Sequence, residues 1–79
     1  MTQDNIFKNY RPVVGDMAVI IKSKRIKLKL TRAYVAKRCC ISVSALEDIE
    51  QGIGFISVKT LCALSSTLDI NPITLLQCR

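Results

Sequence analysis

The sequence predicts an all-α domain of five short helices. Over most of the chain, apolar residues recur three and four positions apart, which places them on one side of a helix. Side chains that can cap a helix N-terminus precede four of the segments, at Thr31, Ser42, Ser57 and Asn71. At 79 residues the chain has the length of one domain, near the lower limit for a self-sufficient core.

The first twelve residues differ from the rest of the chain. They are polar, lack an apolar period and end in Pro12. We interpret residues 1–12 as an N-terminal arm, with a disordered terminus as the alternative. The folded domain is then expected to span residues 13–79.

The first helix is expected from Val14 to Leu28. Met17, Ile21 and Leu28 share one face of this helix, and Arg25 lies on the same face. A buried charge is strongly unfavourable unless an opposite charge accompanies it. The expected partner of Arg25 is Glu50, at the end of the third helical segment.

The stretch from Thr31 to Gly52 holds two short helical segments joined by a tight connection at Cys39–Ile41. The apolar residues of both segments lie at helical spacing: Val35, Ala36 and Cys39 in the first, Leu46 and Ile49 in the second. Gly52 follows where a helix commonly stops in a left-handed cap. Two short helices joined by a turn of this kind form a helix-turn-helix.

The C-terminal third supplies two more helices. Residues Ile53–Ser57 contain a central glycine and are expected to form a loop. The fourth helix is expected over Val58–Leu68. Asn71 and Pro72 are a typical cap and first residue of a helix, and they open the fifth. The apolar residues of this last helix are Ile73, Leu75 and Leu76.

Composition argues against several classes of protein. The chain has four cysteines without C-x-x-C spacing and no histidine, so we expect neither a metal site nor a catalytic thiol with a histidine base. There is no Gly-rich phosphate loop, and we expect no enzyme activity and no cofactor. No apolar run is long enough to span a membrane. Buried, reduced thiols in a cytoplasmic protein are the expected state of the cysteines.

Positive charge is concentrated in the N-terminal half. Residues 1–40 carry ten Lys and Arg against two Asp, whereas residues 41–79 carry two basic and four acidic side chains. The net charge of +6 favours a polyanionic partner, and nucleic acid is the first choice. The alternative is a solvated basic helix face.

Four segments, taken in this order and spacing, resemble the Cro/repressor-type helix-turn-helix regulators, also called the XRE-like family. They are residues 22–30 (KSKRIKLKL), 31–36 (TRAYVA), 41–52 (ISVSALEDIEQG) and 60–76 (TLCALSSTLDINPITLL). The resemblance covers about Val19 to Leu76. It implies a lambda-repressor-like DNA-binding domain in which the second and third helices form the helix-turn-helix.

The resemblance also implies residue roles. Arg25 and Glu50 stand where many members have a buried ion pair. The recognition helix, about residues 42–50, would enter the major groove and read base edges with Ser42, Val43, Ser44, Glu47 and Asp48. We expect phosphate contacts from Lys27, Lys29, Arg32 and Lys37.

This chain departs from the family in two places. The family often reads bases with Gln, Arg, Lys or Asn, which pair with purine edges, whereas Glu47 and Asp48 are carboxylates that repel phosphates. The loop after Gly52, often basic in the family, is apolar here. We therefore expect a contact between two copies of the chain, with packing inside one copy as the alternative. The expected dimer residues are Ile53, Phe55, Ile56, Ile73 and Leu76.

These observations lead to two hypotheses about function. The first is a sequence-specific transcriptional regulator that binds a two-fold operator in double-stranded DNA as a homodimer. Repression is favoured over activation. The alternative is a protein-interaction module, such as an antitoxin or phage-type accessory protein, that uses the same fold without specific DNA binding.

Overall fold

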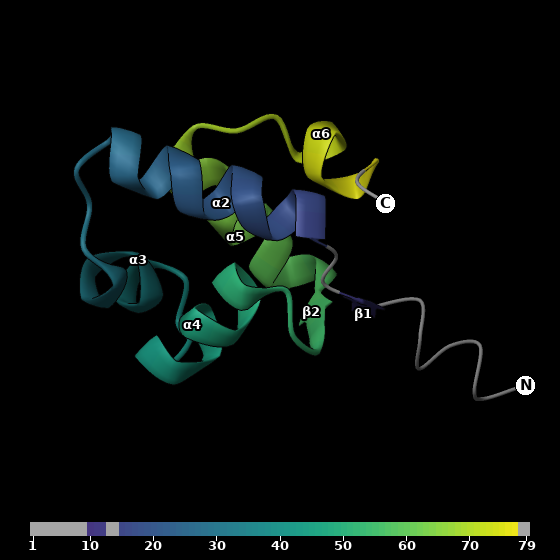
Figure 1. The fold of residues 1–79 in the computed structure, drawn as a ribbon, viewed down its shortest axis with the longest axis horizontal. Coiled ribbons are helices and arrows are strands. Elements are labelled where there is room, and N and C mark those ends of the chain that lie inside the picture. Colours follow the sequence, from purple (N-terminus) through teal and green to yellow (C-terminus); the bar gives the residue numbers. More distant parts are fainter. Residues whose placement is uncertain (1–9, 13–14, 78–79) are drawn as a thin grey trace, which may run out of the picture.

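The computed structural model describes residues 10–12 and 15–77, which form five helices and two short strands (Figure 1). In chain order these are β1 (Tyr10–Pro12), α2 (Gly15–Lys27), α3 (Arg32–Arg38), α4 (Val43–Gln51), β2 (Phe55–Ser57), α5 (Val58–Leu68) and α6 (Pro72–Leu76). The five predicted helices are confirmed. Residues 1–9 of the predicted arm lie outside the described residues, and its last three residues form β1.

The predicted capping residues start their helices. Thr31, Ser42, Ser57 and Asn71 each accept a hydrogen bond from a backbone N–H in the first turn. Gly52 ends α4 at φ 77°, where its N–H donates to the carbonyl oxygens of the last turn. This left-handed conformation suits glycine, because a Cβ would be strained there.

The core lies where α2, α3, α4 and α5 meet. Its largest fully buried side chains are Ile21, Val35, Leu46, Ile56, Leu61, Leu64, Leu68 and Leu75. Leu28, predicted on the buried face of the first helix, is instead exposed. The reason is that α2 ends at Lys27, and Lys29 takes a left-handed conformation with φ 59° that redirects the chain toward α3.

Residues Ile53–Ser57 do not form the predicted loop throughout. Phe55–Ser57 forms β2, which pairs antiparallel with β1 so that Arg11 lies opposite Ile56. Alternate residues of a strand point to opposite faces, so Phe55 is exposed while Ile56 is only 2% exposed. The assignment of Ile56 to a dimer interface is therefore wrong, because this side chain belongs to the core.

The cysteines do not all follow the expectation of buried thiols. Cys39 is buried, but Cys40 and Cys62 are free and exposed, and Cys78 lies outside the described residues. Burial raises the pKa of the Cys39 thiol, and a hydrogen bond with Thr67 at 3.7 Å opposes that rise. In the described part of the chain, no three His, Cys, Asp or Glu side chains group as metal ligands. No helix there is long and apolar enough to cross a membrane.

Candidate nucleic-acid interface

Helices α3 and α4 pack against each other as a helix-turn-helix. The turn between them is tight: Cys40 has φ 58°, and the Ile41 N–H donates to the Ala36 carbonyl oxygen at 3.0 Å. Ser42 then starts α4 by accepting from the Ala45 N–H at 3.0 Å. The buried sides of both helices face the core, so the outward side of α4 is open to a ligand.

An ion pair fixes α4 to α2. The Arg25 Nε donates to Glu50 Oε2 at 2.6 Å, and its Nη2 donates to Oε1 at 3.2 Å. The Nη1 of the same guanidinium donates to the Leu30 carbonyl oxygen at 2.9 Å. The side chain of Glu50 is only 2% exposed, so the pair is removed from water. The ion pair predicted from the sequence is present.

Arg32 joins this pair, which the sequence reasoning missed. Its Nε donates to Glu50 Oε1 at 3.0 Å, and its side chain remains 38% exposed. One carboxylate thus serves two guanidinium groups, so the cluster carries a net positive charge. Apart from the bond to Glu50, the Arg32 side chain makes no hydrogen bond to residues 15–77. Its terminal nitrogens are therefore available to an anion at the surface.

The predicted base-reading residues lie together on α4. All five are exposed, and they occupy the start and outward face of the helix: Ser42, Val43, Ser44, Glu47 and Asp48. Helix α4 contains three acidic residues and no Lys or Arg. Base contacts from this helix are therefore limited to hydroxyl, methyl and carboxylate groups.

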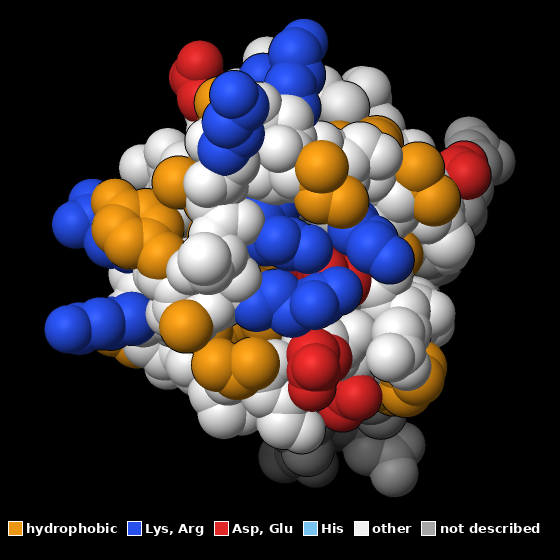
Figure 2. Space-filling model, turned by 60° about the vertical axis from the view of Figure 1, so that its left-hand side comes forward, with side chains coloured by type: hydrophobic (Ala, Val, Ile, Leu, Met, Phe, Trp, Pro, Cys, Tyr) orange, Lys and Arg blue, Asp and Glu red, His pale blue; other side chains and the backbone are white. Residues whose placement is uncertain are grey.

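The predicted phosphate-binding residues are only partly brought together. Lys and Arg side chains gather on one face of the molecule, with carboxylates at its lower edge (Figure 2). Lys29 and Lys37 are exposed on the connection before α3 and on α3 itself. Lys27 instead lines a hollow with Asp69 and Ile70, at the connection from α5 to α6. That connection and α4 lie on opposite sides of α2 (Figure 1), so the hollow that Lys27 lines is on the side of α2 away from α4.

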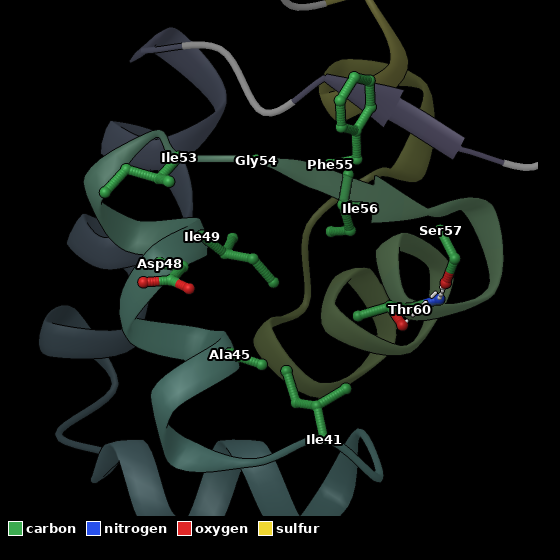
Figure 3. A pocket seen from close by; sticks show the side chains of 10 residues that line it. All are labelled: Ile41, Ala45, Asp48, Ile49, Ile53, Gly54, Phe55, Ile56, Ser57 and Thr60. Carbon is green, nitrogen blue, oxygen red and sulfur yellow. Dashed lines mark hydrogen bonds between the residues drawn. The ribbon is translucent and has the colours of Figure 1, made fainter. Parts of the chain in front are cut away.

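A groove of about 430 Å³ lies between α4, β2 and α5 (Figure 3). Its lining is mostly apolar and includes Ile49 and Ile56, both buried, together with the exposed Asp48. Ile53 and Phe55 also border the groove, and Phe55, which is 60% exposed, projects away from Ile56. The apolar surface expected after α4 is therefore present, next to the acidic side of the recognition helix.

A helix-turn-helix family model matches residues 21–75, which is more than half of the chain. The chain belongs to the helix-turn-helix family. The match confirms the predicted membership of the Cro/repressor type, a family of DNA-binding regulators, and it contains the α3–α4 unit and the Arg25–Glu50–Arg32 cluster. No curated protein and no solved structure matches the chain.

Proposed function

We propose that this helix-turn-helix protein is a sequence-specific transcriptional repressor that acts in the cytoplasm and binds a two-fold operator as a homodimer. The observation that supports this function best is the open outward face of α4, beside basic side chains exposed on the connection after α2 and on α3. The protein needs no cofactor and no metal for this role, and it carries out no catalysis.

In the proposed complex, α4 lies in the major groove. Val43 packs on a thymine methyl group, and Ser44 bonds a base edge. Glu47 and Asp48 accept hydrogen bonds from the amino group of cytosine. Ser42, at the start of the helix, completes the set. Because carboxylates repel the DNA backbone, the complex depends on cations elsewhere for most of its affinity.

Those cations are Arg32, Lys29 and Lys37. Arg32 is the best placed of the three, since Glu50 holds its Nε and leaves the rest of the guanidinium to reach a phosphate. The same carboxylate also holds Arg25 and links α2 to α4. A phosphate bound by Arg32 would therefore be positioned relative to the recognition helix.

The dimer interface that we propose contains Ile53 and Phe55, with Ile73 and Leu76 of α6 as further members. Ile53, Phe55 and Ile73 are large apolar side chains exposed in one copy, and Leu76 is partly buried. Dimers of this motif class place their two recognition helices one DNA turn apart, about 34 Å. An apolar interface next to α4 can fix such a spacing.

Phe55→Ser is expected to weaken self-association at least tenfold, because the homodimer buries this side chain in both copies and full burial of a Phe contributes roughly 1.5–3 kcal/mol. Analytical ultracentrifugation measures the dissociation constant, and circular dichroism should show unchanged helicity because Phe55 lies outside the core. Ile56→Ser is the matched variant: it should lower the melting temperature, since Ile56 is buried. A fully dimeric Phe55→Ser protein would move the interface elsewhere.

The double variant Ser44→Ala/Asp48→Ala is expected to weaken binding to the selected operator at least tenfold, since each good base contact contributes ~1–3 kcal/mol. The operator is first obtained by selecting bound DNA from a random pool, which also reveals half-site symmetry. Both side chains are exposed, so the dimer should stay intact. Unchanged operator affinity with an intact dimer would contradict the base-reading role of α4.

A second candidate function is a protein-interaction module without specific DNA binding. Two features favour it: the acidic side of α4, and the groove beside it that Ile53 and Phe55 border. A basic, apolar segment of another protein would match both features. Random-pool selection separates the two functions, because this module would enrich no sequence.

A further inference from the structure

The outward face of α2 carries apolar side chains that the proposed function does not use. The opposite face of this helix is buried through Met17, Ala18, Ile21 and Arg25. On the outward face, Val19 and Ile26 are 64% and 56% exposed. Exposed apolar groups rimmed by charges are typical of an interaction surface.

Two hollows of about 350 Å³ each lie along α2 and widen this surface. One is lined by Ile20, Ser23, Lys24, Lys27, Asp69 and Ile70, the other by Asp16, Val19, Ile20, Thr74 and Gln77. Ile20 borders both hollows, so the surface is continuous. We call the stripe formed by Asp16, Val19, Ile20, Ser23, Ile26 and Lys27 the α2 band. The α5–α6 connection beside it lies across α2 from α4 (Figure 1).

Charge along the α2 band is ordered from acidic to basic. Asp16 lies in the first turn of α2 and Lys27 in the last, on nearly the same side of the helix. They are separated by about 16 Å along the helix axis. If a second α2 lies antiparallel on the first, each Asp16 meets the Lys27 of the other copy. Ile20 and Ser23 then meet around the same midpoint, and the two helix dipoles oppose each other favourably.

We propose that the α2 band is a self-association surface through which two copies of this chain pack α2 against α2 in antiparallel orientation. The occupant is a second copy because the band is complementary to itself: acid meets base at both ends, and Ile20 of each copy meets Ser23 of the other near the middle. The band lies away from α4 and from the groove next to Phe55. It can therefore join one homodimer to the next, and only this consequence rests on the proposed function.

The size of the band indicates a weak contact in solution. Helix α2 has 13 residues, a length of about 20 Å. A crossing of two such helices falls below the ~1,200 Å² that marks the low end of stable interfaces. Two homodimers on adjacent operators are held at high effective concentration, so even a weak contact there produces cooperative binding.

A charge exchange tests the antiparallel pairing. Sedimentation equilibrium of the full chain is measured for wild type, Asp16→Lys, Lys27→Asp and the double variant that combines both. Each single variant places like charges opposite each other and should weaken the α2 contact at least tenfold. The double variant reverses both signs and should restore it. The proposal would be overturned if all four proteins self-associate equally strongly, or if the double variant associates as weakly as the single variants.

A cross-link tests the position of the crossing. Ser23→Cys is placed in a background in which Cys40, Cys62 and Cys78 are serine, and it should form an intermolecular disulfide under mild oxidation. Lys22→Cys, an exposed position of α2 outside the α2 band, is the matched control and should not cross-link. No cross-link through position 23, or equal cross-linking at both positions, would contradict the antiparallel packing.

The same cross-link separates this proposal from the proposed function. Adding Phe55→Ser should weaken the operator-binding homodimer and leave the disulfide at position 23 unchanged. If adding Phe55→Ser removes the cross-link through position 23, both contacts belong to one interface, and the α2 band is overturned. If operator binding fails while the charge exchange behaves as expected, the DNA-binding role fails and the α2 band stands.

Discussion

Glu50→Gln is expected to destabilise the fold by ~3–5 kcal/mol, because within residues 15–77 it removes the one carboxylate that accepts from Arg25 and Arg32. Glutamine has nearly the same volume, so the core stays filled and the effect is electrostatic. The guanidinium of Arg25, whose side chain is buried, would be left near a second positive charge with no anion. Thermal unfolding measures the effect, and a loss of at least about 10 °C is expected for a domain of this size.

Glu47→Gln is the matched control, since Glu47 is on the same helix but exposed. It removes the same charge and should leave the melting temperature almost unchanged. Glu50→Leu/Arg25→Met should recover most of the lost stability, because a buried ion pair can be replaced by apolar groups at little cost. A Glu50→Gln protein as stable as the wild type would show that the cluster does not hold α2 and α4 together.

The helices were predictable because their signals are local. A capping side chain acts on N–H groups within three residues of itself, so Thr31 or Ser42 identifies a helix start without knowledge of the fold. The left-handed cap at Gly52 is equally local. The helical spacing of apolar residues predicted which side chains are buried within each helix. The same rule gave a wrong prediction for Leu28, because this residue lies just beyond the end of α2.

The β1–β2 ribbon could not be predicted from the sequence in the same way. Its strands have three residues each, too few to show an alternating pattern, and they pair across most of the chain. Because the ribbon was missed, Ile56 could not be distinguished from Phe55, although a strand sends adjacent side chains to opposite faces. This explains why the predicted dimer surface included a core residue.

The sequence predicted the part of the site that follows from pairing a buried charge, which is the ion pair between Arg25 and Glu50. Arg25 within an apolar stripe demanded a carboxylate, and Glu50 supplied it. That Arg32 shares this carboxylate depends on how α3 approaches α4, which no local pattern specifies. Lys27 was grouped with Arg32 because both belong to one basic stretch of sequence. Such a stretch does not show to which side of the molecule each side chain points. Lys27 follows Asp16 by eleven residues, so both lie on nearly the same side of α2. This spacing could have placed Lys27 on the side of α2 away from α4.

DNA binding is expected to weaken about 10²- to 10⁴-fold between 50 and 200 mM salt, since contacts with roughly four to eight phosphates per dimer give a slope of log K against log[salt] near −4 to −7. The physical reason is that each neutralised phosphate releases condensed counterions. Fluorescence anisotropy with the selected operator, across a series of salt concentrations, measures the slope. A slope near zero would exclude phosphate contacts as the main source of affinity.

Lys37→Ala tests which cations produce the slope. Lys37 is exposed on α3, and its removal from both copies should reduce the magnitude of the slope by about 2. Lys59→Ala is the matched control: Lys59 is an exposed lysine on α5, outside the proposed DNA surface, and its loss should leave the slope within error. Because α4 is acidic, binding should depend on α3 cations more than on the recognition helix. Equal effects of the two variants would mean that net charge alone attracts DNA, without a defined phosphate-binding surface on α3.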